Sequence, residues 1–362
     1  MGIKNITEDG QLDLSEIRHV SEEEYPRWTR RVTPQPGDVV FTYEATLHRY
    51  AIIPEGFRGC LGRRIALVRP NPGQADSRYL LYFFFSRNWR NVVESSVITG
   101  ATVDRVPLEK FPNFPAALPR LDVQQRIAGV LSAYDDLIEN NRRRMALLEE
   151  AARQLYREWF VRLRFPGHEH TRITKGVPEG WERGQLGELS EITMGQSPES
   201  KHYNEDGEGL PFHQGVSDFG DRFVTHRIYS TALNRVAEAG DILCSVRAPV
   251  GRLNVTLDKI VIGRGLAALR SKTGHQSLLL QQLRAHFFKE DLIGGGAIFA
   301  SVTKKEFSAQ ALLEPPERLR RAFEEMTVPC DDQIRVLHLE NQQLRAARDL
   351  LLPRLMSGEI AA

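Results

Sequence analysis

The chain of 362 residues contains one unit twice, and this internal repeat constrains its fold more than any other feature. The stretch GDVVFTYEATLHRY, residues 37–50, aligns without a gap on GDILCSVRAPVGRL, residues 240–253. The stretch CLGRRIALVR, residues 60–69, then aligns on VIGRGLAALR, residues 261–270. The order of the matching segments is preserved, so the chain is predicted to be two copies of one strand-rich unit.

A third matching pair, GATVDRV near Gly100 and FASVTKKEF near Phe299, comes next, and a long charged helix closes each copy. These helices are predicted from Tyr134 to Phe160 and from Cys330 to Met356, each beginning at an Asp-Asp pair. Their apolar residues recur in alternate steps of three and four, which is the a/d seam of a coiled coil. The predicted seam positions are Ile138, Met145, Leu148, Leu155, Ile334, Leu337, Leu344 and Leu351.

Two asparagines, Asn141 and Asn341, also lie on the seams. A polar layer in a coiled coil fixes the register of the helices at some cost in stability. The alternative is that these asparagines lie where the two helices diverge.

Short β-branched runs such as DVVFTY, RIALVR, DILCSV and KIVI are broken by glycine and proline, with helical stretches between them. Each strand-rich copy is therefore predicted to be mixed α/β (α+β). Proline-rich segments and a polar linker set the predicted boundaries: a first strand-rich domain at residues 1–118, a helix region at 119–165, a second domain at 166–315, and a second helix region at 316–362.

Composition restricts the class of protein. Lys and Arg number 48 against 47 Asp and Glu, so global charge argues neither for nor against a nucleic-acid partner. The sequence shows neither a long apolar stretch nor a signal-peptide pattern, and its three cysteines are far apart, so we expect a cytoplasmic protein without a membrane partner.

Catalytic signatures are missing from the sequence. It has no GxxxxGK[ST] phosphate-binding loop, and its only double proline, in EPPE at residues 314–317, is a helix entry rather than a methyltransferase motif. His168 and His170 lie two apart in a linker, which does not suit a metal site. The chain is therefore predicted to be noncatalytic, with no cofactor or metal site of its own.

Three stretches carry a resemblance to a known family: LDVQQRIAGVLSAYDDLIENNRRRMALLEEAARQLYREWFVRL, GWERGQLGELSEITMGQSPES and the closing RDLLLPRLMSGEI. Together they resemble the specificity subunit of type I restriction-modification systems. The resemblance implies two target recognition domains that each read one half of a split asymmetric DNA site, separated by two antiparallel coiled-coil helices. It also implies methyltransferase subunits as partners, two in number by the repeat, and restriction subunits bound through them. S-adenosylmethionine, Mg and ATP are expected on those partners.

The first copy departs from this pattern. The equivalent of GWERGQLGELSEITMGQSP is missing, and MGIKNITEDG begins about where PFHQGVSDFG stands in the second copy. We therefore expect a shortened first target recognition domain with an open sheet edge and a weaker half-site.

A split site requires a ruler, and a helix of about 28 residues spans roughly 42 Å at ~1.5 Å per residue. That length corresponds to about twelve base-pair steps. Two domains at its ends could address major-groove patches about one turn apart.

Side chains with forked donors or acceptors in loops are the candidates for DNA contact. The predicted base readers are Tyr43, Glu44, His48, Gln196, Ser197, Lys201, Tyr203, Gln214 and Arg247. Glu44 and Arg247 share an aligned position but differ, as expected for two different half-sites, although a variable loop is the alternative. The predicted phosphate contacts are Arg49, Arg63, Arg64, Arg252 and Arg264, two pairs of which repeat between the copies; for them the alternative is an intramolecular ion pair.

Three aromatic residues near the end of the first helix exceed what one partner helix can cover. Tyr156, Trp159 and Phe160 are therefore predicted to help dock methyltransferase subunits. An alternative function for the chain is a partner-binding scaffold or decoy with defective DNA recognition.

Overall fold

The computed structural model describes residues 1–99, 103–287 and 301–361, and it divides into two compact units. The first unit contains residues 1–143 and 337–362, and the second contains residues 144–336. Each unit holds one strand-rich globular part and one segment of each of the two long helices. The third aligned pair, near Gly100 and Phe299, lies partly outside the described residues.

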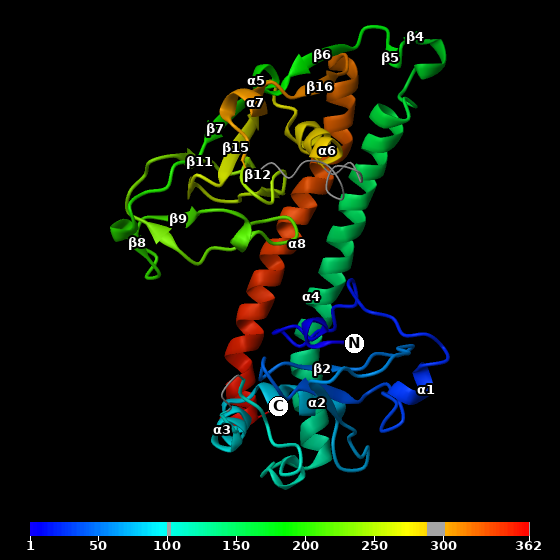
Figure 1. Ribbon diagram of the computed structural model, residues 1–362, viewed down its shortest axis with the longest axis vertical. Coiled ribbons are helices and arrows are strands. Elements are labelled where there is room, and N and C mark those ends of the chain that lie inside the picture. The colour runs from blue at the N-terminus through cyan, green and yellow to red at the C-terminus, as the bar shows by residue number, and fades with distance from the viewer. Residues whose placement is uncertain (100–102, 288–300, 362) are drawn as a thin grey trace. The chain divides into compact units, whose positions relative to one another are not determined.

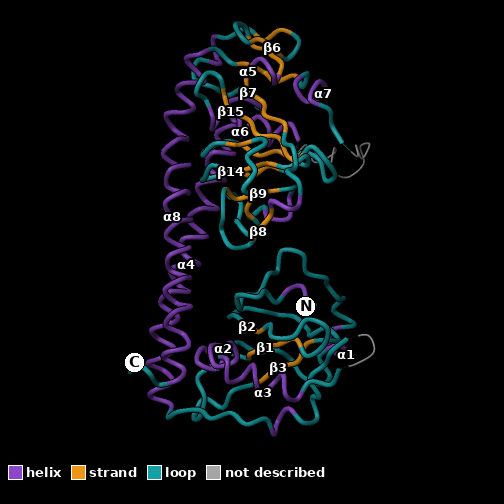
Figure 2. The backbone as a smooth tube through the Cα atoms, turned by 90° about the vertical axis from the view of Figure 1, so that its left-hand side faces the viewer, coloured by secondary structure: helices purple, strands orange, loops and turns teal. Residues whose placement is uncertain are grey.

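The first unit is built on a three-stranded antiparallel sheet in the order β2-β1-β3. Aromatic residues of α2 pack on this sheet, and the side chains of Asp76 and Ser86 cap the first turns of α2 and α3 by accepting from Tyr79 N and Trp89 N. These elements can be followed in Figure 2. Their bounds are β1 Val39–Thr42, β2 Tyr50–Ile52, β3 Ile65–Val68, α1 Tyr25–Trp28, α2 Ser77–Phe85 and α3 Arg87–Ser96.

The second unit has a four-stranded antiparallel sheet in the order β13-β12-β15-β7. Strands β7, β12 and β15 of this sheet are labelled in Figure 1. A second sheet has the order β11-β14-β9-β10-β8, in which β14 and β9 are parallel. The first sheet is formed by β7 Ser190–Met194, β12 Ile242–Ser245, β13 Leu253–Val255 and β15 Leu266–Ser271; the second by β8 Tyr203–Asn204, β9 Leu210–His213, β10 Tyr229–Ser230, β11 Val236–Ala237 and β14 Ile260–Ile262. The remaining elements are β4 Ile173–Thr174, β5 Val177–Pro178, β6 Glu182–Gln185, β16 Ala311–Glu314, α5 Leu186–Leu189, α6 Gln276–Phe287 and α7 Lys304–Ser308.

The repeat in the sequence is a repeat in strand pairing. Val39 pairs with Ile52 in the first unit, as Ile242 pairs with Val255 in the second. In both units the third strand, β3 or β15, joins the other side of the central strand. The aligned segments therefore form the same three-stranded core.

Residues that are identical in the two copies hold the same turn. Asp38 accepts from Arg69 at 2.8 Å, and Asp241 accepts from Arg270 at 2.8 Å. The other carboxylate oxygen accepts from Gln35 N in the first unit and from Glu238 N in the second, both at 2.8 Å. This shared ion pair explains why each copy has an aspartate before the central strand and an arginine at the end of the third strand.

The edge beyond the third strand differs between the units. In the second unit β7 pairs with β15, whereas β3 is an edge strand in the described part of the first unit. Gly62 N donates to Met1 O at 2.8 Å, as Gly263 N donates to His213 O at 2.8 Å. Met1 therefore occupies the place of His213, which agrees with the alignment of MGIKNITEDG on PFHQGVSDFG.

The long helices are α4, Leu121–Tyr156, and α8, Glu317–Ser357, and a π-helical turn at residues 157–161 follows α4. The expectation that each helix begins at its Asp-Asp pair is wrong, because both pairs lie well inside the helices. The early part of α8 is stabilised by Leu319 and Phe323, which are buried against an aromatic cluster. That burial offsets the backbone hydrogen bond that Pro329 cannot make.

The two helices run antiparallel within each unit. In the first unit Asn141 Nδ2 donates to Asn341 Oδ1 at 3.1 Å, and Asn341 Nδ2 donates to Ile138 O at 3.3 Å. The asparagines thus form a buried polar layer and do not lie at a divergence of the helices. The mixed α/β class with two repeated domains and long helices is confirmed by this architecture.

The predicted seam residues pack in their own units. In the first unit Ile138 and Leu337 are buried, Leu344 is half-buried, and Leu351 packs on the main core. In the second unit Met145 and Leu148 pack on the core that contains Ile334, while Leu155 packs on an aromatic cluster.

The first aspartate of each Asp-Asp pair ties its helix to the globular part. Asp135 accepts from Tyr82 Oη and from Arg348 Nη1, each at 2.5 Å. Asp331 accepts from Ser277 Oγ and, at 2.5 Å, from Arg222 Nη2. The equivalent carboxylates therefore fasten α2 or α6 to the long helices.

A polar side chain of a long helix also meets the beginning of α2 or α6, from positions that do not align when Asp135 is placed on Asp331. Gln124 Oε1 accepts from Asp76 N at 3.1 Å, whereas Glu324 Oε1 accepts from Leu278 N at 2.8 Å. Burial, together with the charge of nearby Asp331, raises the pKa of Glu324 from 4.5 to about 7. The contact at the start of α2 thus uses a neutral amide, whereas the contact at the start of α6 uses a titrating acid.

We expect the second unit to lose stability as pH rises from 4.5 to about 7. A folded-state pKa above the ordinary value means that the stabilisation is complete below the ordinary pKa and is lost as the folded carboxyl ionises. Glu324→Gln should remove this loss of about 1–2 kcal/mol, as measured by denaturant unfolding near pH 5 and near pH 8. Glu325→Gln, at an exposed ion pair with Arg321, is the matched control and should leave the decline unchanged.

Candidate nucleic-acid interface

Four of the predicted contact residues of the second unit come together where β7, β9 and β14 end. Ser197 Oγ donates to Gln214 Oε1 at 2.7 Å and accepts from Arg264 N at 3.2 Å. Gln196 N donates to Ile262 O at 2.9 Å. The side chains of Gln196, Gln214 and Arg264 are exposed beside this junction, which places forked donors and acceptors on one patch.

Glycines make this junction possible. A Cβ on Gly195 would lie 2.1 Å from Gly263 O, and a Cβ on Gly265 would lie 2.5 Å from Gln214 O. Distances this short cannot be accommodated without moving the backbone. The glycines therefore bring the loops close enough for Ser197 to bridge them.

Arg247 lies next to the junction. Val246 N donates to Gly265 O at 2.9 Å, and Arg247 forms a backbone bridge with Ser301. Its side chain is exposed and has no hydrogen-bond or ion-pair partner within the described ranges. Arg252, on the same connection, is also exposed; its backbone N donates to Ser245 Oγ and its backbone O accepts from Ser245 N, each at 2.9 Å, and its side chain has no partner in the described residues.

Two other predicted base readers of the second unit have protein partners. Lys201 forms an ion pair with Glu199 at 2.6 Å. Tyr203 donates to Pro198 O at 2.9 Å and stacks on Phe212 with ring centroids 4.7 Å apart. Tyr203 therefore supports the loop that carries Ser197, and its hydroxyl is already used.

A histidine chain lies behind Gln214. Fully buried His213 contacts His226, with Nε2 and Nδ1 3.0 Å apart, and His226 Nε2 lies 3.0 Å from Asp258 Oδ2. Burial, followed by the charge of His226, lowers the pKa of His213 to about 4. His213 is therefore neutral near pH 7 and acts as a packed support rather than a cation for DNA.

In the first unit two predicted contact residues pair with each other. Glu44 Oε1 lies 3.0 Å from Arg64 Nε, so the acid that was predicted to read a base holds an arginine that was predicted to bind phosphate. The Tyr43 hydroxyl donates to the backbone carbonyl Arg63 O. The Arg63 side chain is exposed and has no partner in the described part of the chain.

His48 and Arg49 are engaged within the first unit. Arg49 Nη2 lies 2.8 Å from Glu8 Oε1, so the alternative of an intramolecular ion pair applies to Arg49 but not to Arg252. The two aligned arginines thus have different surroundings, and contact of either one with phosphate stays a prediction. His48 faces Glu94 at 3.6 Å with 17% of its side chain exposed, and burial, with the charge of Arg90, lowers its pKa. A half-buried neutral imidazole is a weak candidate for base contact.

The aromatic residues that were predicted to dock partner subunits are in the core of the second unit. Trp159 and Phe160 pack with Phe165, Trp181 and Phe323, and Tyr156 packs against the same cluster. Burial raises the pKa of the Tyr156 hydroxyl. The prediction of docking by these three residues is therefore corrected, because strands and loops beyond the partner helix cover their rings.

Sequence reasoning missed the apolar side chains that remain exposed on the long helices. Leu147 is 70% exposed and Leu350 is 72% exposed. Both lie outside the a/d positions, and this departure from the seam is the signal that could have identified them. They are the alternative candidates for partner contact.

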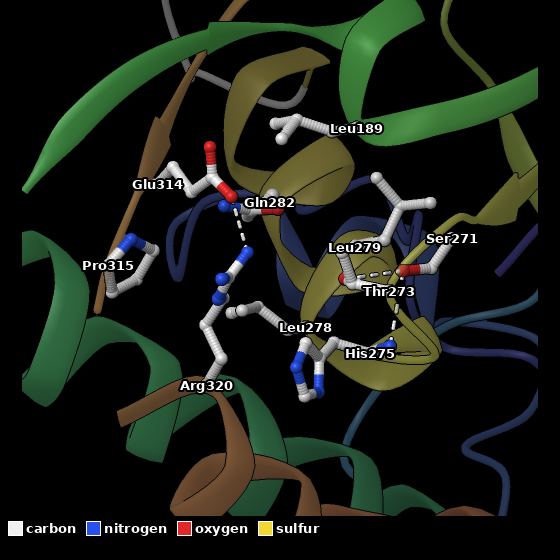
Figure 3. A pocket seen from close by; sticks show the side chains of 10 residues that line it. All are labelled: Leu189, Ser271, Thr273, His275, Leu278, Leu279, Gln282, Glu314, Pro315 and Arg320. Atoms are coloured by element: carbon white, nitrogen blue, oxygen red, sulfur yellow. Dashed lines mark hydrogen bonds and ion pairs between the residues drawn. The ribbon is translucent and has the colours of Figure 1, made fainter. Parts of the chain in front are cut away.

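A small pocket of the second unit, shown in Figure 3, contains none of the proposed DNA contacts. Arg320 and Glu314 form an ion pair there, and His275 N donates to Ser271 Oγ at 3.1 Å. In residues 1–99, 103–287 and 301–361, no His, Cys, Asp or Glu cluster suits a metal ion. Within those same ranges no helix is both long and apolar enough to cross a membrane.

Comparison with known proteins agrees with this arrangement. Residues 24–150 match the family model described as type I restriction modification DNA specificity domain. The putative type I restriction enzyme MjaX specificity subunit of Methanocaldococcus jannaschii is 29% identical over 371 residues, covering 97% of this chain and 85% of the relative. The MjaIX specificity subunit of the same organism is 23% identical, covering 95% and 82%. The crystal structure of a type I restriction-modification system S subunit from M. genitalium has a TM-score of 0.56 at 15% identity, covering 98% of this chain and 90% of that one, and this likeness shows the fold.

Proposed function

Because residues 24–150 match the type I restriction modification DNA specificity domain and the chain is similar to specificity subunits over nearly its whole length, we propose that it is such a subunit, which reads a split asymmetric DNA site and directs partner methyltransferase and endonuclease subunits to it. The observation that carries this proposal is the repeated sheet. Its equivalent loops present exposed arginines in both units, while the side chain at the aligned position differs, as Glu44 and Arg247. A shared framework with different loop side chains suits two half-sites of different sequence.

The partners follow from the same proposal. Specificity subunits are noncatalytic, so two methyltransferase subunits, with restriction subunits bound through them, would supply the chemistry in the cytoplasm. S-adenosylmethionine, Mg and ATP would bind to those partners. Leu147 and Leu350 are the most exposed of the apolar side chains on the long helices, and they are candidates for such contacts in place of the buried aromatic residues.

The proposed function is tested with the complex of this chain and its cognate methyltransferase. Mapping methylated adenines in a host that carries both should return a two-part sequence. Binding of duplexes with that sequence should weaken linearly with the logarithm of salt concentration. Assembly of the complex without any sequence preference would contradict DNA recognition and support a scaffold or decoy.

Arg247→Ala should remove the preference for one base pair of one half-site. The exposed guanidinium has the fork that meets guanine O6 and N7, so its loss should cost roughly 1–3 kcal/mol at that pair and leave the other half-site unaffected. Competition binding with single-base variants measures this.

Arg252→Ala and Arg264→Ala are the matched controls for Arg247→Ala. If those residues contact phosphates, their loss should weaken all sequences alike and lower the salt slope by about one. Uniform weakening by Arg247→Ala would instead assign that residue to the DNA backbone.

A further inference from the structure

The position shared by Glu44 and Arg247 has equivalent backbone surroundings in the two units. Tyr43 N donates to Arg64 O at 3.1 Å, as Val246 N donates to Gly265 O at 2.9 Å. Backbone bridges join Glu44 to Arg105 in the first unit and Arg247 to Ser301 in the second. Residues around this position can therefore be compared one by one.

The charged residues around this position differ between the units. In the first unit, the acid at position 44 has Arg64 and Arg105 as its neighbours. In the second, the arginine at position 247 has Gly265 and Ser301 at the equivalent places. A side chain at Gly265 is excluded because its Cβ would lie 2.5 Å from Gln214 O. Each unit thus has an arginine at this place. In the first unit it is Arg64, just before β3, and in the second it is Arg247, just after β12.

Glu44 contacts Arg64 at Nε and not at its two terminal Nη groups. Glu44 Oε1 faces Arg64 Nε at 3.0 Å, and the side chains are 27% and 46% exposed respectively. The two Nη groups of Arg64 have no partner in residues 1–99, 103–287 and 301–361. Those two groups form the fork that meets paired acceptors, and an acid on Nε restricts the rotation of the guanidinium.

Resting on the proposed function, we propose that Arg64 reads a base in the first half-site and that Glu44 is its positioning residue. The acceptor pair it fits is guanine O6 and N7, the same chemistry that Arg247 meets in the other half-site. Glu44 does not read cytosine, because its carboxylate is half-buried and holds Arg64.

Phosphate contact suits Arg64 less well than base contact. A carboxylate 3.0 Å from its Nε neutralises much of its charge and would repel a phosphate brought close to the pair. The neighbouring Arg63 is exposed and has no acid beside it in the described residues, so it is the better phosphate ligand. Of the two adjacent arginines, Arg64 therefore contacts a base and Arg63 contacts a phosphate.

The experiment uses the complex with methyltransferase subunits and duplexes that carry its mapped site. Arg64→Ala should lower affinity for the cognate duplex roughly 10- to 100-fold and remove the preference at one G·C pair of one half-site. Arg64→Lys keeps the charge but loses the fork, so it should also lose that preference. Replacing that guanine by 7-deazaguanine should weaken the wild type and cause no further loss in Arg64→Ala.

Glu44→Gln tests the positioning role. It should reduce the preference at the same base pair, and it should have no effect on base preference when Arg64 is already alanine. Arg63→Ala is the matched control and should weaken all duplexes alike, with a salt slope lower by about one. Circular dichroism of each variant complex confirms that the fold is retained.

Two results would overturn the inference: uniform weakening by Arg64→Ala, or a change of base preference by Glu44→Gln in the Arg64→Ala background. Either result can be told apart from failure of the proposed function. If the wild-type complex discriminates between sequences, the function stands and only the role of Arg64 is lost. If the wild type shows no preference, the function itself fails.

Discussion

Replacement of Asp331 by alanine is expected to lower the free energy of unfolding of the second unit by about 3–5 kcal/mol. Asp331, on α8, accepts from Arg222 Nη2 at 2.5 Å, and Glu149, on α4, lies 3.3 Å from both Arg222 Nη1 and Arg284 Nη2. Only 6% of the Arg222 side chain is exposed. Without Asp331, the buried Arg222 guanidinium keeps only Glu149, which it shares with Arg284. The loss of stability comes from the desolvation of a charge that is no longer fully compensated.

Denaturant unfolding of the purified chain or its complex measures this loss. Asp332→Ala is the matched control, because Asp332 makes an exposed pair with Arg335 at 3.6 Å and its loss should change stability by less than about 0.5 kcal/mol. The double variant Arg222→Ala with Asp331→Ala should lose less than the sum of the single variants, since the buried charge is gone as well. Equal small losses at Asp331 and Asp332 would refute a structural role for the network.

Trp159→Ala is expected to cost about 3–5 kcal/mol of stability, mainly through loss of core packing. Trp159 is 9% exposed and its ring lies 6.1 Å from that of fully buried Phe323, centroid to centroid. Phe160 lies 5.7 Å from Trp181 in the same cluster. An indole removed from such a cluster leaves a cavity that its aromatic neighbours cannot fill by rotation.

The measurement compares thermal unfolding with copurification of the methyltransferase. Leu147→Ala is the matched control, because a side chain that is 70% exposed should contribute less than about 0.5 kcal/mol to stability. If Leu147 contacts a partner, its loss should weaken copurification while the unfolding temperature stays unchanged. A stable Trp159→Ala chain that no longer binds methyltransferase would restore the docking role predicted from the sequence.

The sequence by itself determined the repeated framework. Gly37 and Gly240 have φ angles of 85° and 87°, a region that favours glycine, and the same aspartate follows each. This backbone conformation is set by local sequence, so the same residues stand at aligned positions. The repeated turn can therefore be recognised from the sequence alone. The sequence also placed Asn141 and Asn341 on the seams, but the hydrogen bond between them, rather than a divergence of the helices, is a finding of the structure.

Only the tertiary structure decided which side chains are free to act. Arg49 is held by Glu8, and Glu44 holds Arg64, whereas Arg247 has no partner in the described chain. A sequence shows that an arginine is present in a loop, but not whether a distant segment brings an acid within 3 Å of it. The same holds for the aromatic residues at the end of α4 and just after it. They are buried because Phe323, from a segment far along the chain, packs against them. Ion pairing and burial are set by three-dimensional proximity, and for these residues that proximity is created by chain segments far apart in sequence.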